Sequence, residues 1–164
     1  MIQKKICLLG SSNVGKTSLV KQFVEGIFNE KYLTTIGVKI DKKVVVFENE
    51  QVKLMVWDIE GSDRYNPFQE KYLRGCSGYI VVSDRTRSSS LSEAVEIHML
   101  ARKVIDCPVI LAVNKYDLPA TWNWNDDGLQ DHHNLFDEVF DTSAKSGENV
   151  ENMFLKLVEL MLKD

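Results

Sequence analysis

The stretch Gly10-Ser11-Ser12-Asn13-Val14-Gly15-Lys16-Thr17 decides the fold of this 164-residue chain. It follows the apolar run at residues 6–9, and residues 18–25 behind it carry apolar side chains at helical spacing. The order is therefore strand, glycine loop, helix. Glycines at both ends let the backbone turn tightly, so that successive N–H groups and the helix N-terminus face an anion. The stretch predicts a phosphate-binding loop.

The residue types of the loop indicate separate tasks. We expect Lys16 to reach the terminal phosphates of a nucleotide, and the Thr17 hydroxyl to ligate Mg²⁺, a hard cation that prefers oxygen. The other residues of this stretch expected to contact the nucleotide are Gly10, Ser12, Asn13, Val14, Gly15 and Ser18. The alternative is a chance glycine turn beside a surface lysine, and it leaves the flanking strand and helix patterns unexplained.

Length and composition indicate one domain over residues 1–164, with 44% apolar and 27% charged residues. The net charge of −4 gives no electrostatic reason to expect a nucleic-acid partner. Cys7, Cys76 and Cys107 are expected to be reduced thiols packed as small hydrophobic groups, which favours a cytoplasmic location. Because position 2 is Ile2 and the C-terminus lacks a cysteine, we expect no direct lipid anchor in this chain. We expect a monomer.

The hydrophobic pattern predicts an α/β fold, with a mostly parallel six-stranded sheet and helices on both faces. Besides the first strand, strands are expected over residues 37–48, 52–57, 78–84, 108–113 and 139–140. Helical segments are expected over residues 68–73, 91–105, 128–136 and 150–161. Ser90 or Ser92 is the expected N-cap of the second of these helices. Since ligands bind at the carboxyl ends of such strands, the motifs that follow strand ends should converge on one edge.

Five features resemble, in their order and approximate spacing, the Ras superfamily of small GTPases. They are residues 10–17, Thr35, Asp58-Ile59-Glu60-Gly61, Asn114-Lys115-Tyr116-Asp117 and Ser143-Ala144-Lys145. The resemblance covers essentially the whole chain. The strings Thr35-Ile36-Gly37-Val38, residues 53–58 and Tyr72-Leu73-Arg74-Gly75 are similar to those of the Rab branch. The resemblance implies a P-loop NTPase G domain that binds GTP and GDP with Mg²⁺ and hydrolyses GTP.

The resemblance also implies roles for single residues. Thr17, Thr35 and Asp58 would bind the metal, and the Gly61 N–H would meet the γ-phosphate. Asp117 would accept hydrogen bonds from the N1–H and amine of guanine, whereas adenine would present an unpaired acceptor there. The other residues around the base would be Asn114, Lys115, Ser143, Ala144 and Lys145, with Phe28 packing or covering the base. The catalytic set would be Lys16, Thr35, Gly61 and Ser62.

Two segments, near residues 30–40 and 60–75, are expected to change conformation with the γ-phosphate. They would bind effector, exchange and activating proteins. The apolar groups Ile36, Ile40 and Trp57 are the expected partner surface. Packing within the sheet is the alternative, and it is stronger for Ile40 than for Ile36.

The chain departs from the family at the second of these segments. The family's Asp-Thr-Ala-Gly-Gln-Glu is replaced by Asp58-Ile59-Glu60-Gly61-Ser62-Asp63. The glutamine that orients the attacking water is thus Ser62, whose hydroxyl is too short for that task, so hydrolysis should be slow. Three explanations stay open: a long-lived GTP-bound interaction module, a partner that inserts the missing group, or a water placed by Glu60, Asp63 or Arg64.

Two other classes of protein are weaker interpretations. An ATP-using P-loop phosphotransferase conflicts with Asp117, and residues 120–134 offer acids and tryptophans where such an enzyme needs a basic lid. An interaction domain that binds no nucleotide would leave the intact loop without a task. His98, His132 and His133 lack metal-ligand companions at zinc spacing, and they are expected to be surface or helix-face residues.

Overall fold

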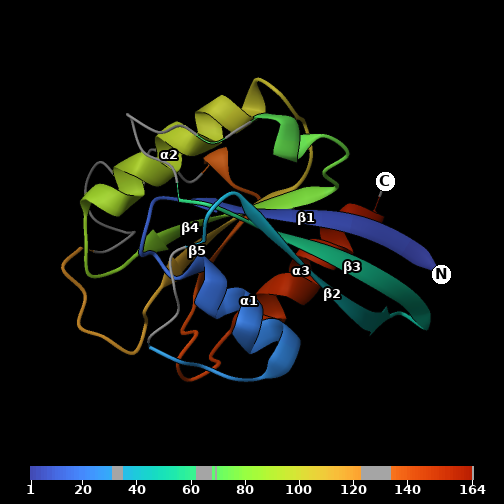
Figure 1. The fold of residues 1–164 in the computed structure, drawn as a ribbon, viewed down its shortest axis with the longest axis horizontal. Helices are drawn as coiled ribbons and strands as arrows, with labels where there is room; N and C mark the ends of the chain where they lie inside the picture. Colours follow the sequence, from blue (N-terminus) through green and yellow to red (C-terminus); the bar gives the residue numbers. More distant parts are fainter. Residues whose placement is uncertain (31–34, 62–67, 69, 123–133, 164) are drawn as a thin grey trace.

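The computed structural model describes residues 1–30, 35–61, 68, 70–122 and 134–163 (Figure 1). The elements in chain order are β1 (Ile2–Gly10), α1 (Lys16–Glu25), β2 (Val38–Phe47), β3 (Glu50–Ile59), the 3₁₀ turn η1 (Glu70–Leu73), β4 (Gly78–Asp84), α2 (Ser89–Arg102), β5 (Val109–Asn114), β6 (Glu138–Asp141) and α3 (Val150–Leu162). The described strands form one six-stranded sheet in the order β2-β3-β1-β4-β5-β6. Only the β2–β3 hairpin pairs antiparallel within it. The predicted mostly parallel sheet is confirmed.

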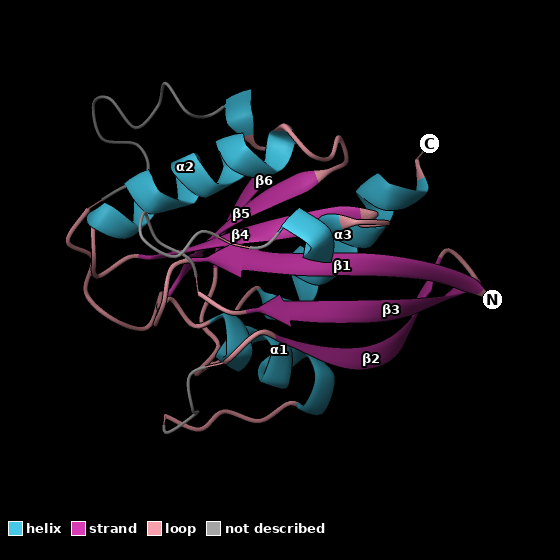
Figure 2. Ribbon diagram, turned by 45° about the horizontal axis from the view of Figure 1, so that its top comes forward, coloured by secondary structure: helices cyan, strands magenta, loops and turns pink. Residues whose placement is uncertain are grey.

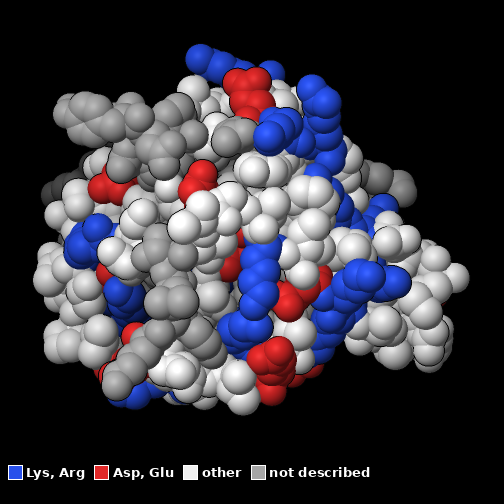
Figure 3. Space-filling model, in the orientation of Figure 1, with Lys and Arg blue, Asp and Glu red and all other residues white. Residues whose placement is uncertain are grey.

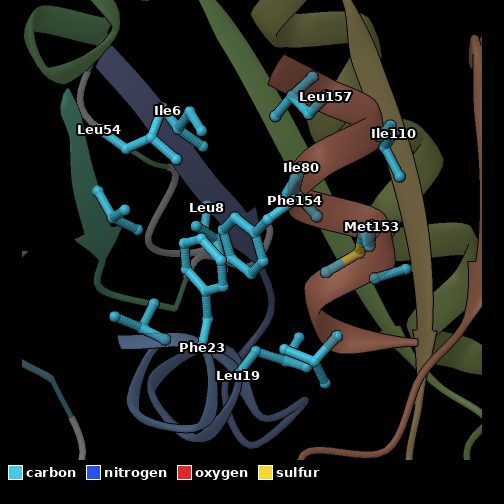
Figure 4. Packing of buried hydrophobic residues seen from close by; sticks show 14 of the residues in the cluster. Ile6, Leu8, Leu19, Phe23, Leu54, Ile80, Ile110, Met153, Phe154 and Leu157 are labelled. Atoms are coloured by element: carbon cyan, nitrogen blue, oxygen red, sulfur yellow. The ribbon is translucent and has the colours of Figure 1, made fainter. Parts of the chain in front are cut away.

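Helices cover both faces of the sheet. In Figures 1 and 2, α2 lies on one side, and α1 and α3 lie together on the other. On the α1–α3 side, Phe23 and Phe154 stack with ring centroids 3.9 Å apart (Figure 4). Because α1 begins at Lys16, this contact fixes the helix that carries the end of the phosphate loop.

The last helix follows its predicted stripe. The apolar residues at the expected spacing are all buried, namely Val150, Met153, Phe154, Leu157, Val158 and Met161. The helix packs so closely on the sheet that a Cβ added at Gly78 would lie 2.9 Å from the sulfur of Met161. The glycine that opens β4 therefore makes room for α3.

Several predicted boundaries are wrong, and one has a clear cause. Neither Ser90 nor Ser92 is the N-cap of α2, which begins at Ser89 and ends at Arg102. The Ser90 hydroxyl lies 2.9 Å from the Asp84 carbonyl oxygen and accepts a hydrogen bond from the Asp84 N–H, so it is buried against the end of β4. The helical segment after Phe68 is reduced to η1, and the helix predicted over residues 128–136 lies mostly outside the described residues.

The three thiols are free, as predicted. Cys7 and Cys76 are buried and Cys107 is half-buried, all within or against the apolar cluster beneath α2. Charges of both signs are interspersed over the face in Figure 3. Within the described part of the chain, no helix has the length and apolar character needed to cross a membrane.

His98 lies on the inner face of α2 and is buried, so the prediction of a surface residue is wrong while that of a helix-face residue holds. The Tyr79 hydroxyl lies 2.9 Å from its Nδ1. Burial lowers the pKa of His98 to about 4, and the charge of Arg102 acts in the same direction. His132 and His133 lie outside the described residues.

This buried histidine predicts acid sensitivity. Its folded pKa of about 4 lies below the ordinary value of 6.5, so the unfolded chain binds more protons between these values. The stabilisation is complete above pH 6.5 and is lost as the pH falls to 4, by about 3 kcal/mol in total. Denaturant unfolding at pH 7 and pH 4.5 should show a smaller loss in His98→Gln than in wild type. Equal losses would contradict this role.

Candidate functional site

The carboxyl ends of the parallel strands meet at a cavity of about 390 Å³. Most of the predicted site residues line it, namely Ser12, Asn13, Gly15, Lys16, Thr17, Ser18, Phe28, Thr35, Asp58, Gly61, Asn114, Lys115, Asp117, Ala144 and Lys145. The predicted convergence of the motifs on one edge is therefore observed. Ser62 lies outside the described residues.

Three predicted contact residues do not line the cavity, and their neighbours explain why. Gly10 lies so close to β4 that an added Cβ would sit 2.7 Å from the Val82 carbonyl oxygen. The Val14 carbonyl accepts a hydrogen bond from Asn114, and the Ser143 hydroxyl donates one to Asp117. These residues support the cavity wall from behind, and their contact with a nucleotide stays a prediction.

The phosphate loop is built around a tight approach to the end of β5. Gly15 has φ of +101°, a conformation that favours glycine, and a Cβ there would overlap the side-chain amide of Asn114. That amide donates to the Val14 carbonyl at 2.9 Å, and its oxygen accepts a hydrogen bond from Thr142 at 3.2 Å. Asn114 thereby joins the loop to the end of β5 and to the segment after β6.

Lys16 places a buried positive charge at the floor of the cavity. The residue is 6% exposed, and its ammonium donates to the carbonyls of Gly10 and Ser11, at 3.0 and 2.9 Å. Burial lowers the pKa of Lys16 to about 8, although the charge of Asp58 opposes this shift. Among the described residues, no carboxylate lies within 4.0 Å of this ammonium. A buried cation without an ion-pair partner is costly, so an anion at this position would be stabilised.

Three oxygen-bearing side chains meet beside Lys16. The Thr17 hydroxyl lies 2.7 Å from that of Thr35 and donates to the Asp58 carboxylate at 2.6 Å. The Thr35 hydroxyl donates to the same carboxylate oxygen at 3.3 Å. Burial raises the pKa of Asp58, against the hydrogen bond from Thr17 and the charge of Lys16. The other oxygen of Asp58 is buried and has no hydrogen-bond partner among the residues that the structure describes. This set of hard oxygen donors fits a Mg²⁺ ion.

The far end of the cavity is formed by segments after β5 and β6. The Ser143 hydroxyl donates to the Asp117 carboxylate at 2.8 Å, and Gln22 of α1 donates to the Ala144 carbonyl at 2.7 Å. Lys145 forms an ion pair with Glu30 at 3.6 Å across the cavity mouth. Glu30 and Leu118 also line the cavity, and nothing in the sequence pattern singled them out.

Lys115 connects the segment after β5 with the phosphate loop. It lines the cavity, and its ammonium donates to the Asn13 carbonyl at 2.9 Å and pairs with Asp84 at 2.8 Å. Burial tends to raise the pKa of Asp84, but hydrogen bonds from Lys115 and Thr86 outweigh it and hold this pKa below its usual value. Asp84 was missed, although it ends β4 much as Asp58 lies at the end of β3.

The expected partner residues differ in exposure. Ile36, next to Thr35, is 88% exposed, and Ile40 is 43% exposed. Trp57 is half-buried, with Lys5 over its ring and Tyr72 tilted against it. Trp122 is a loop anchor, because its indole N–H donates to the Asp84 carbonyl at 2.9 Å. Trp124 lies outside the described residues.

A glycine loop between β1 and α1, with a buried lysine and a cavity at the sheet edge, defines a P-loop nucleotide-binding protein. The family model described as "Ras family" matches residues 5–163. The chain belongs to the Ras family of small GTPases, the GTP-binding switch proteins, and within it the chain is Rab-like.

Rab proteins of animals are among the proteins similar to this chain. Ras-related protein Rab-13 of Mesocricetus auratus is 34% identical over 165 residues, which cover 97% of this chain and 80% of the relative. Ras-related protein Rab-3 of Caenorhabditis elegans is 32% identical over 160 residues, 96% of this chain and 73% of the relative. Ras-related protein Rab-18 of Caenorhabditis briggsae is 32% identical over 168 residues, with 97% and 80% covered.

Proposed function

We propose that this chain binds GDP and GTP with Mg²⁺ in the cavity and that the γ-phosphate changes the conformation of residues near 30–40 and 60–75. The observation that carries the proposal is a pair of buried groups on one wall. Lys16 is a buried cation without an ion-pair partner among the described residues, and Asp58 is a buried carboxylate with one unpartnered oxygen. The Lys16 ammonium suits a phosphate group, and the Asp58 carboxylate suits a metal ion.

The phosphates would lie over the loop that precedes α1. Its backbone N–H groups and the N-terminus of α1 favour an anion, and Lys16 supplies a full positive charge. In the described conformation this ammonium donates to two carbonyls of its own loop. We expect it to exchange these for phosphate oxygens. The Gly61 N–H would meet the γ-phosphate, because Gly61 lies against Ser12 of the loop.

Thr17, Asp58 and Thr35 would hold the metal. When bound, Mg²⁺ would neutralise charge on the β- and γ-phosphate oxygens. Thr17 and Asp58 belong to α1 and β3, whereas Thr35 comes from the segment before β2. Thr35 therefore provides the physical link between this cluster and the exposed Ile36 beside it. Loss of its ligands would release this segment, which supports the expected binding of effector, exchange and activating proteins here.

Guanine would occupy the end of the cavity near Asp117. A carboxylate there accepts hydrogen bonds from the N1–H and amine of guanine, while the N1 lone pair of adenine would face this carboxylate without a hydrogen bond. The Ala144 N–H would meet the guanine oxygen, and the hydrogen bond from Gln22 to the Ala144 carbonyl supports this loop conformation. Phe28 and Lys145 line the same end of the cavity and would flank the base.

We also propose that this chain hydrolyses GTP slowly. This proposal rests on Ser62, which replaces the glutamine that orients water, and the alternative is a hydrolysis-deficient GTP-bound interaction module. The backbone of Glu60 is held in place, because its N–H donates a hydrogen bond to the Gly37 carbonyl at 2.8 Å. We also propose a cytoplasmic location, which the three free thiols support.

Chelation of Mg²⁺ tests the metal site. EDTA should speed release of a fluorescent GDP from wild type by about tenfold or more, because a hard cation would no longer bridge nucleotide and protein. Asp58→Ala should release GDP equally fast with and without Mg²⁺. The matched control is Asp106→Ala, since the Asp106 carboxylate is 100% exposed and should leave the response to EDTA intact. A wild-type response in Asp58→Ala would refute the assignment.

Single-turnover hydrolysis of bound GTP tests the role of Ser62. Wild type should be slow, and Ser62→Gln should raise the rate about tenfold or more, because the longer amide can orient water. Ser92→Gln makes the same change at an exposed position of α2 and should leave the rate at the wild-type value. If wild type is as fast as Ser62→Gln, the water is placed by another group, such as Glu60, Asp63 or Arg64.

A further inference from the structure

We propose that Arg87, which lies outside the nucleotide motifs, is a positioning residue that orients the phosphate loop and raises the preference for GTP over GDP. The inference rests on the proposed function of the cavity. Arg87 follows β4 by three residues and is not among the residues that line the cavity. It therefore acts through the loop.

Arg87 bridges the end of β4 and the phosphate loop. Its Nη2 donates to the Ser12 carbonyl at 3.0 Å, and its Nε lies 3.3 Å from the Asp84 carboxylate. A planar guanidinium can make both contacts at once in a fixed geometry. Asp84 is 1% exposed and is itself held by hydrogen bonds from Thr86, so it is a rigid anchor.

Asp84 also holds the next peptide of the phosphate loop, through Lys115. Lys115 pairs with Asp84 and donates to the Asn13 carbonyl, so two successive carbonyls face cations fixed on one carboxylate. In a trans peptide the C=O and the following N–H point in opposite directions. Holding the carbonyls of Ser12 and Asn13 toward Arg87 and Lys115 therefore turns the N–H groups of Asn13 and Val14 away from these cations. Successive N–H groups aimed alike form an anion-binding concavity.

Ser12 is also the contact point between the loop and Gly61, at the start of the segment near residues 60–75. A Cβ added at Gly61 would lie 2.7 Å from the backbone nitrogen and Cα of Ser12, so the two backbones touch. Arg87 thus braces the residue against which Gly61 packs. This contact lies where the proposed function puts the γ-phosphate.

The positive charge of Arg87 also favours GTP over GDP. The guanidinium of Arg87 donates to the carbonyl of Ser12, the residue against which Gly61 packs. Its positive charge therefore lies close to the place proposed for the γ-phosphate. GTP carries more negative charge than GDP, so GTP gains more from the field of this charge. By contrast, Arg85 donates to the Tyr116 carbonyl and lies over its ring, on the side of the base loop.

The test compares affinities of purified full chain for the non-hydrolysable analogue GppNHp and for GDP, both with Mg²⁺. Arg87→Gln should lower the ratio of GppNHp affinity to GDP affinity about fivefold, the scale of one partly screened charge. Lys103→Gln removes the same charge from an exposed position after α2 and should leave the ratio unchanged. In an Asp84→Asn background, where the anchor is weakened, Arg87→Gln should change the ratio less.

An unchanged ratio in Arg87→Gln would overturn the inference. An equal loss of both affinities would overturn it too, because that is the effect of a residue that only stabilises the fold. Failure of wild type to bind any guanine nucleotide would overturn the proposed function itself. Wild-type binding with an unaffected ratio refutes only the role of Arg87, so the two failures are distinguishable.

Discussion

The hydrogen bond of 2.6 Å from Thr17 to the buried carboxylate of Asp58 joins the first turn of α1 to the end of β3. The remaining geometry of the site depends on this junction. It places Lys16 at the cavity floor. It also brings together the Thr17 hydroxyl and the Asp58 carboxylate, and the Thr35 hydroxyl, from the segment before β2, contacts both. The carboxylate is kept in the core by three hydrogen-bonding and charged neighbours, although one of its oxygens is unpartnered. Such a site gains stability when a cation arrives.

Two buried side chains keep the other loops in place around this junction. Asn114 joins the phosphate loop to the end of β5 and to Thr142. Asp84 joins the same loop to the segment after β5, through Arg87 and Lys115. Both residues end neighbouring parallel strands, where carboxyl ends converge. A nucleotide bound here would therefore contact loops that are already cross-linked by the protein's own polar groups, which reduces the ordering cost of binding.

The parts of the fold predicted from sequence are those fixed by local pattern. The phosphate loop, the six-stranded sheet and the α3 stripe follow from glycine spacing and apolar period. The predicted N-cap of α2 is wrong because the Ser90 hydroxyl contacts the Asp84 carbonyl oxygen, and this tertiary contact overrides the capping preference. Arg87 was missed because its partner, Ser12, lies 75 residues away in sequence and no spacing rule connects them. The ion pair between Lys115 and Asp84 was missed for the same reason.

The central claim is that the cavity selects guanine nucleotides through Asp117 with a metal ion at Asp58. Calorimetric titration of nucleotide-free protein with GDP and with ADP, both in Mg²⁺, tests it most directly. We expect GDP to bind about 10³-fold tighter than ADP or better, because the N1 lone pair of adenine would face the Asp117 carboxylate without a hydrogen bond. Comparable affinities for the two nucleotides, or no binding of either, would contradict the claim.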